Sequence, residues 1–248
     1  VDLGLLASVV RAEVQVYRQP RVAFFSTGDE LKGLGEPLDP GDIYDSNRYT
    51  LAAMLRQTGA RVIDMGVIAD DAEAVKRAFE TASANADMVI TSGGVSVGEA
   101  DFVTRTLEEL GEIGFWKIAM KPGRPLSFGK IGDACFFGLP GIPVSVMATF
   151  QIVVSPAIAS LQGKQASPRL TLKARLLDNI RKTPGRTDFQ RGVVEQDESG
   201  ELCVRTTGMQ ASHILRSMSL ANCFVVIPRD SGDVAAGEFV TVMPFLGT

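Results

Sequence analysis

The residues best suited to chemistry lie in a turn from Thr91 to Gly98. This turn follows the apolar segment Met88–Ile90, which is typical of a buried strand, and it precedes a helical segment. Two consecutive glycines leave peptide N–H groups able to point at one anion, and three hydroxyl side chains add donors. Ordinary tight turns also contain glycines, but a place between a strand and a helix favours a phosphate site. The residues expected at the ligand are Thr91, Ser92, Gly93, Gly94, Ser96 and Gly98.

Two aspartates near this turn each have two alternative roles. Asp101 stands where the next helix is expected to begin, and Asp commonly caps the first helical turn. A carboxylate beside a bound phosphate would repel it unless a cation lay between them. Asp101 is therefore alternatively a Mg²⁺ ligand, with water and phosphate oxygens completing the shell. The same two roles apply to Asp70. We favour the metal role for Asp101 and the capping role for Asp70.

Three cations lie close together in the sequence, namely Lys117, Lys121 and Arg124. The last two belong to the segment Lys121–Pro125, whose prolines and glycine restrict the backbone. Surface lysines are usually solvated, but constrained cations in an otherwise acidic chain suit an oxyanion. His213 is the only histidine, so the sequence has neither a histidine-based catalytic triad nor a histidine metal cluster. These residues favour phosphoryl-type chemistry by positioning, Mg²⁺ and cations.

Alternating strand and helix patterns would position these residues. The β-branched and aromatic segment Val22–Ser26 is followed by a polar loop and by apolar residues at helical spacing, with caps at Asp45–Asn47 and a closing Gly59. The pattern repeats as far as Leu161, which predicts a three-layer α/β domain with a mostly parallel sheet. Further strands are expected at 62–67, 88–90, 116–118, 125–128 and 135–137, and further helices at 72–84, 101–110 and in a long apolar segment ending near 161.

The pattern changes near residues 163–168, where the composition becomes polar and the apolar residues begin to alternate. Strands are expected at 170–176, 190–194, 202–206, 223–228 and 239–243, separated by Gly, Asp and Ser turns, which predicts a small all-β domain. We therefore divide the chain into residues 1–19, a remnant of an N-terminal domain or linker, an α/β domain over residues 20–165 and a C-terminal β domain over residues 166–248.

Composition narrows the function classes. The chain has 25 Lys and Arg against 29 acidic residues, a formal charge of −4, so no excess positive field attracts nucleic acid. Cys135, Cys203 and Cys223 lack metal or redox spacing and are expected to be reduced packing residues, with Cys135 and Cys223 in buried strands. No apolar stretch approaches the roughly 20 residues of a membrane span, and no signal peptide opens the chain. We expect a cytoplasmic protein that binds neither nucleic acid nor membrane.

Seven short motifs occur along nearly the whole chain. They are Ser26–Leu31, Asp45–Asn47, Thr91–Gly98 with Asp101, Lys121–Pro125, Leu139–Gly141 with Pro143–Ser145, Asp188–Arg191 and Gln210–His213. Their order and spacing resemble the molybdopterin molybdenumtransferase family, which includes the E domains of gephyrin and of its plant relatives. One such motif would be weak evidence, whereas seven in order are specific.

The resemblance implies molybdenum cofactor biosynthesis by insertion of molybdate into adenylylated molybdopterin, with Mg²⁺-assisted release of AMP. It makes the turn Thr91–Gly98 with Asp101 the nucleotide-phosphate and Mg²⁺ site. By the same resemblance, the acidic cleft residues are Glu30 and Asp70, the groups that hold molybdate are Lys117, Lys121, Arg191 and Ser212, and further cofactor-binding residues are Pro140 and Pro143. Several fixed N–H and O–H donors are what a divalent oxyanion requires.

The chain departs from the family pattern in two places. Family members carry elongated N-terminal domains that complete the cleft across a homodimer, and Val1–Gln19 resembles only the last part of them. Ile142 stands where the family motif has asparagine, so an apolar side chain replaces an amide that can order a turn or contact the ligand. The resemblance also implies contact with other proteins of molybdenum cofactor biosynthesis.

Two other functions fit the same fold. A gephyrin-like binding scaffold would present a groove for a peptide, but the sequence indicates no exposed aromatic-rich groove. A molybdopterin adenylyltransferase shares the α/β domain, but the attached β domain with Arg191 and Ser212 argues against it. We therefore rank the molybdenumtransferase first.

Overall fold

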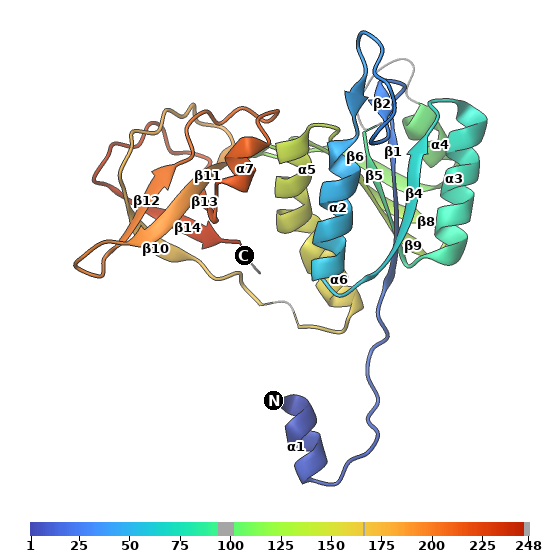
Figure 1. Ribbon diagram of the computed structural model, residues 1–248, viewed down its shortest axis with the longest axis horizontal. Coiled ribbons are helices and arrows are strands. Elements are labelled where there is room, and N and C mark those ends of the chain that lie inside the picture. Colours follow the sequence, from blue (N-terminus) through green and yellow to red (C-terminus); the bar gives the residue numbers. More distant parts are fainter. Residues whose placement is uncertain (94–101, 166, 246–248) are drawn as a thin grey trace.

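The computed structural model describes residues 1–93, 102–165 and 167–245. These residues form two domains that lie side by side, preceded by an extended N-terminal segment that points away from both (Figure 1). The first domain is the predicted α/β domain and the second is the predicted β domain.

A six-stranded sheet lies at the centre of the first domain. Its strands are β1 (Arg21–Thr27), β4 (Arg61–Ile68), β5 (Met88–Ser92), β6 (Gly111–Lys117), β8 (Pro125–Ile131) and β9 (Ala134–Leu139). In the order β4-β1-β5-β9-β8-β6, the first four strands are parallel and the last two are antiparallel to their neighbours. The central strand β5 is buried along its whole length because both faces of the sheet are covered. The mostly parallel sheet predicted from the sequence is confirmed.

Helices form the two outer layers. One face carries α2 (Ser46–Gln57) and a continuous helical run made of α5 (Pro143–Thr149), the π-helical turn η1 (Phe150–Val154) and α6 (Ser155–Leu161); the other carries α3 (Ala72–Asn85) and α4 (Phe102–Leu110). Successive side chains of a strand point to opposite faces, so Phe24 packs under α2 and its neighbour Phe25 packs under α3. Asp45 caps α2 by accepting a hydrogen bond from the Arg48 N–H at 3.0 Å, as predicted.

The helical run Pro143–Leu161 differs from one expectation. It is 19 residues long with a mean hydropathy of 1.8, so by length and composition alone it is apolar enough to cross a membrane. However, Val146, Phe150, Val154 and Ile158 repeat every four residues and are buried against the sheet. This spacing gives the run one core-facing side, and we assign it to the core of the first domain.

The second domain is a six-stranded sheet in the order β12-β10-β14-β13-β11-β7. Its elements are β7 (Met120–Lys121), β10 (Leu172–Leu176), β11 (Thr187–Gln196), β12 (Leu202–Thr206), the short helix α7 (Arg216–Ser219), β13 (Cys223–Ile227) and β14 (Phe239–Pro244). Strand β12 pairs with both β10 and β11, which closes the sheet on itself. Strand β7 lies in the segment predicted for the first domain, but its two residues pair with Thr187 and Asp188 of the second sheet.

The two domains are joined by more than their connecting chain. The Val144 N–H in the first turn of α5 donates to the Ser212 carbonyl at 3.1 Å, and the Thr187 N–H donates to the Ala119 carbonyl at 2.9 Å. An apolar cluster also spans the junction. Its buried members are Met120, Val144, Ala148, Met218, Phe224 and Met243. This shared core fixes the β domain against the start of α5.

The N-terminal segment contacts the first domain only near its end. Its helix α1 (Asp2–Ser8) buries no residue. The Arg18 guanidinium donates to both carboxylate oxygens of Asp87, at 2.5 and 2.6 Å, and the Arg21 N–H donates to the same carboxylate at 2.7 Å. Most of residues 1–19 thus form an exposed segment that is fastened at Arg18. A separate pair of short strands, β2 (Leu31–Lys32) and β3 (Ile43–Tyr44), lies beyond β1.

Candidate functional site

The carboxyl ends of the parallel strands bring the predicted motifs together. Ser26 at the end of β1 pairs with Ser92 at the end of β5, and Ser92 pairs with Leu139 at the end of β9. The residues that follow each strand therefore leave the sheet side by side. This is the edge at which ligands bind in open α/β sheets. In Figure 1 it is the upper edge of the first domain, where α2 and α5 begin.

Gly93 has a conformation and a position that require glycine. Its φ is +92°, and a Cβ there would lie 2.7 Å from the Thr27 carbonyl oxygen. Its N–H donates to the Leu139 carbonyl at 3.1 Å, so this amide is not available to a ligand, contrary to the sequence-based expectation. The other predicted residues of the turn, Gly94, Ser96 and Gly98, and the predicted metal ligand Asp101 lie outside the described residues.

Asn47 connects three segments at this edge. From the first turn of α2, its side-chain amide donates to the Ser92 hydroxyl at 3.0 Å and to the Gly141 carbonyl at 2.7 Å, and it is 8% exposed. Asp45–Asn47 were predicted as helix caps only, and this connection was not predicted. The motif itself was visible, but its partners are 45 and 94 residues away in the chain.

The two acidic residues predicted in the cleft lie on neighbouring loops. Gly28, with φ +148°, makes room for Glu30, because a Cβ at Gly28 would lie 2.6 Å from a Glu30 carboxylate oxygen. The Asp70 N–H donates to an Asp29 carboxylate oxygen at 3.4 Å. The capping role favoured for Asp70 belongs to Asp71, whose carboxylate accepts from the Ala74 N–H at 2.9 Å.

The predicted cation Lys121 lies at the domain junction, where β7 pairs with β11 of the second domain. Lys121 is half exposed, and its ammonium is 3.7 Å from a carboxylate oxygen of the buried Asp188 on β11. The following loop packs on α5, since a Cβ at Gly123 would lie 2.5 Å from the Thr149 hydroxyl. Lys117 is the last residue of β6, and its side chain is exposed.

Ser212 and the two prolines also lie at the start of α5. Pro143 is the first residue of that helix, and the next N–H, of Val144, donates to the Ser212 carbonyl. Pro140 is buried directly after β9. The structure therefore places Ser212 of the β domain beside the first turn of α5 in the α/β domain.

Arg191 does not have the exposed position expected of a group that holds an anion. It is 1% exposed, and its guanidinium donates to the Ser217 hydroxyl at 3.0 Å and to the Ala211 carbonyl at 3.2 Å. Burial lowers the pKa of Arg191 to about 10. Its backbone N–H and carbonyl are both hydrogen-bonded to the Gln210 side chain. Arg191 therefore holds the loop that carries Ser212, and we correct its predicted role to a positioning one.

Several buried polar atoms beneath this edge have no hydrogen-bond partner within the described part of the chain. They are the hydroxyls of Ser26, Thr91 and Ser127, one carboxylate oxygen of Asp45 and the amide oxygen of Asn47. Thr91 and Ser127 both pair with Gly138, so they lie in one row on the α4 side of the sheet. Unpartnered buried groups cost free energy unless water or a ligand meets them. Their concentration here marks this edge as the polar end of the domain.

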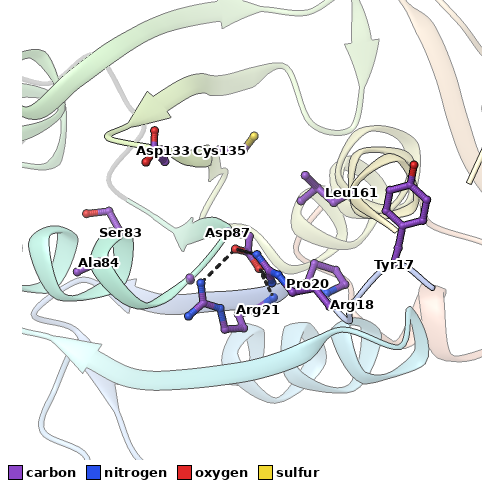
Figure 2. A pocket seen from close by; sticks show the side chains of 11 residues that line it. Tyr17, Arg18, Pro20, Arg21, Ser83, Ala84, Asp87, Asp133, Cys135 and Leu161 are labelled. Carbon is purple, nitrogen blue, oxygen red and sulfur yellow. Dashed lines mark hydrogen bonds and ion pairs between the residues drawn. The ribbon is translucent and has the colours of Figure 1, made fainter. Parts of the chain in front are cut away.

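A cavity that is separate from this site lies elsewhere in the first domain. A cavity of about 560 Å³ lies at the opposite edge of the sheet, near the starts of β1 and β5 (Figure 2). Arg18, Arg21 and Asp87 line it, and Asp87 binds both arginines. Cys135 also lines the cavity; it was predicted to be buried but is half-buried. Cys223 is buried as predicted, and burial raises the pKa of its thiol to about 12, which keeps the thiol protonated.

Comparison with known proteins identifies both domains. Residues 23–160 match a family described as probable molybdopterin binding domain, and residues 173–245 match the MoeA C-terminal region, domain IV. A molybdopterin molybdenumtransferase of Haemophilus influenzae is 48% identical over 246 residues, covering 99% of this chain and 61% of that protein. One of Nostoc is 37% identical over 248 residues, covering 98% and 57%.

A solved structure shows the same architecture. The molybdopterin biosynthesis MoeA protein of Pyrococcus horikoshii superposes with a TM-score of 0.83 at 34% identity, covering 99% of this chain and 59% of that one. The chain thus spans about three fifths of the length of these relatives. Because the match over residues 23–160 covers more than half of the sequence, the chain belongs to the family of the probable molybdopterin binding domain, and this domain is followed by one that matches the MoeA C-terminal region.

Proposed function

We propose that the protein acts in molybdenum cofactor biosynthesis by inserting molybdate into adenylylated molybdopterin, with release of AMP, at the carboxyl edge of the first sheet. The observation that supports this most is the connection made by Asn47. It ties the Ser92 hydroxyl at the start of the phosphate turn to the Gly141 carbonyl at the start of α5. A ligand bound at this edge would therefore meet both motifs in a fixed relative position.

The phosphate-binding part of the proposed site begins at Thr91 and Ser92. Both residues are buried at the end of β5, and the Thr91 hydroxyl has no partner among the residues described. Because the Gly93 N–H is already bonded to Leu139, the peptide donors for a phosphate are expected from the residues after it. This sharpens the proposal to Gly94, Ser96 and Gly98 as the phosphate-contacting residues.

The molybdate-binding part of the proposed site lies at the domain junction. Molybdate is a dianion, and it needs several charged or polar donors in a fixed arrangement. Lys121 is half exposed, and its distance of 3.7 Å to Asp188 is longer than a hydrogen bond. Its ammonium donors therefore suit a ligand. Ser212, also at the domain junction, is held by its contact with Val144, and Arg191 contributes by ordering the loop that carries Ser212.

Mg²⁺ enters the proposal through Asp101. Bound beside a phosphate, the ion neutralises charge on the phosphate oxygens. Within residues 1–93, 102–165 and 167–245, no group of three His, Cys, Asp or Glu side chains could hold a metal ion. We expect Asp101→Asn to weaken Mg²⁺-dependent nucleotide binding more than it lowers the melting temperature, and equal losses would leave Asp101 as a helix cap only.

The proposal extends to a cytoplasmic homodimer in which a second copy completes the cleft. The family resemblance supports this, and sedimentation velocity of the protein over a range of concentrations measures the state directly. A monomer that binds both substrates at full affinity would contradict the shared cleft.

The decisive experiment titrates the folded protein with adenylylated molybdopterin and then with molybdate, by calorimetry, and follows AMP release by chromatography. We expect saturable binding of both ligands and AMP release that requires molybdate. Lys173→Ala should bind both ligands and release AMP like the unmodified protein, because Lys173 is an exposed cation on β10 and not part of the proposed site. If the folded protein binds neither ligand, the enzymatic proposal is wrong.

A further inference from the structure

A different cavity from that of Figure 2, with a volume of about 330 Å³, lies where the first domain leads into the second. It is formed by the end of α2, the π-helical turn η1, the end of α6 and the segment that follows α6. Its volume is at the lower end of the range for small-molecule sites. The 12-residue helix α2 begins at the proposed catalytic edge and ends at this cavity. At 1.5 Å per residue, the two places are about 18 Å apart.

The sequence explains why one wall of this cavity is irregular. Pro156 interrupts the helical run Pro143–Leu161 and has no N–H to donate to a carbonyl one turn earlier. The run accommodates this by widening into η1, from Phe150 to Val154. π-Helical turns of this kind occur frequently at functional sites. Here the turn places Phe150 and Gln151 in the cavity wall.

The charges that line the cavity are all positive. Lys164 and Arg169 line it, and its described lining contains no acidic residue. Neither of these two side chains forms an ion pair or a hydrogen bond with any described residue. Arg169 is half-buried, and burial alone lowers its pKa. A desolvated guanidinium without a counter-ion is unfavourable, so an anionic partner would be bound with a gain in free energy.

Capping of the nearby helix ends does not account for these cations. Lysine and arginine often lie near helix C-termini because the last carbonyls there lack partners. At the end of α2, however, the Thr58 N–H already donates to the Met54 carbonyl and the Gly59 N–H to the Arg56 carbonyl. At the end of α6, backbone N–H groups likewise donate to the last carbonyls. Carbonyls at both helix ends are thus bonded without the side chains of Lys164 and Arg169.

One buried hydrogen-bond acceptor among the residues that line the cavity, the amide oxygen of Gln162, lacks a donor in the described part of the chain. The Gln162 side-chain N–H donates to the Thr58 carbonyl at 2.7 Å, which fixes the orientation of its amide. The amide oxygen of Gln162 is buried and has no partner among the residues described. A ligand that satisfies the whole cavity therefore combines a negative group for the cations with an O–H or N–H for this oxygen.

We propose that this cavity binds a small anion, a phosphate monoester or a carboxylate, that also carries a hydroxyl or amino donor. The anionic group lies between Lys164 and Arg169, and the donor meets the Gln162 amide oxygen. The apolar side chains of Met54, Phe150 and Ala159 contact the carbon atoms of the ligand. Such a ligand would fasten the segment that joins the two domains to the first of them.

The test uses calorimetry on the whole protein at low salt, with glycerol 3-phosphate and glycerate as charged probes and glycerol as the neutral control. We expect at least one charged probe to bind saturably and glycerol not to bind. Arg169→Gln should weaken that binding about tenfold or more, because a charge-assisted hydrogen bond is lost. Lys173→Gln changes the net charge equally outside the cavity and should leave binding unchanged.

Two further outcomes decide the proposal. Propyl phosphate lacks the hydroxyl donor, so it should bind more weakly than glycerol 3-phosphate; equal affinity would overturn the role of Gln162. The anion site itself is overturned if neither charged probe binds to the folded protein, or if Arg169→Gln and Lys173→Gln have the same effect. Melting temperatures of both variants, measured without ligand, establish that the protein compared is folded.

Discussion

Ile142 stands at the residue before the first turn of α5 and has the extended backbone of a helix N-cap, with φ −90° and ψ 126°. Its side chain is half exposed and cannot accept a hydrogen bond, so the cap is missing. Asparagine, the residue of the family motif, would supply an acceptor to the first turn. We expect Ile142→Asn to raise the free energy of unfolding by about 1 kcal/mol, measured by urea denaturation. Ile142→Ala is the control and should give no such gain.

Lys121 carries a second prediction at the same scale. Lys121→Ala removes a cation from the proposed molybdate site, and we expect the molybdate concentration needed for half-maximal AMP release to rise about tenfold. The buried Asp188 also loses its nearest cation, so the melting temperature is measured in parallel. The interpretation as surface charge is correct if the molybdate requirement is unchanged, or if Lys173→Ala raises it equally.

At the scale of elements, the ends of β1, β5 and β9 are held close together by Gly93. A side chain at this position would be unfavourable for two reasons. The φ of +92° is strained for any residue other than glycine, and the Cβ would lie 2.7 Å from the Thr27 carbonyl oxygen. We expect Gly93→Ala to destabilise the protein by about 3 kcal/mol and to abolish ligand binding. Gly35 offers a matched control, since its φ is +88° and nothing lies within 4 Å of a Cβ there. Gly35→Ala should cost only about 1 kcal/mol, and equal losses would contradict the role of the close contact.

The elements themselves were largely predictable because they depend on local pattern. All five strands expected in the β domain are present, and the buried apolar runs of the α/β domain form the expected sheet. Strand β7 was missed because two residues carry no periodicity, and its pairing with Thr187–Asp188 is decided by tertiary contact.

The candidate site was predictable in its residue types but less so in their contacts. The strand–turn pattern indicated Thr91, Ser92 and Gly93 correctly as residues of the carboxyl edge. Burial of Arg191 could not be predicted, because an arginine is usually exposed and the partners of this one, Ser217 and Ala211, come from a later helix and loop. Long-range hydrogen bonds such as those of Asn47 leave no periodic signal in the sequence.

At the scale of the whole molecule, two kinds of junction hold the parts together. The β domain shares an apolar core with the start of α5, and burial of that kind involves no charge that acid could titrate or salt could screen. The N-terminal segment is instead fastened by charge, through Arg18 and Asp87. The two junctions should therefore respond differently to solution conditions.

The charged junction gives the last prediction. The Arg18 guanidinium lowers the pKa of Asp87 well below its ordinary value, with further help from the N–H of Arg21. A group whose pKa is depressed by folding contributes stability above its ordinary pKa and loses it as the pH falls toward the depressed value. The fastening should hold at neutral pH and weaken progressively below about pH 4. The observable is the protection of the Arg21 N–H, which donates to Asp87, against hydrogen exchange.

Asp87→Asn reproduces the protonated state at neutral pH, because the amide keeps the shape of the carboxyl group and removes its charge. We expect protection at Arg21 to fall severalfold in this variant and, to a smaller extent, in the unmodified protein at 1 M salt, since Arg18 is largely exposed and the pair is screened. Asp133→Asn is the matched control, because Asp133 lines the same cavity (Figure 2) without an ion pair among the described residues. Protection that falls equally in both variants would mean that the general charge of the cavity, and not the contact between Arg18 and Asp87, fastens the segment.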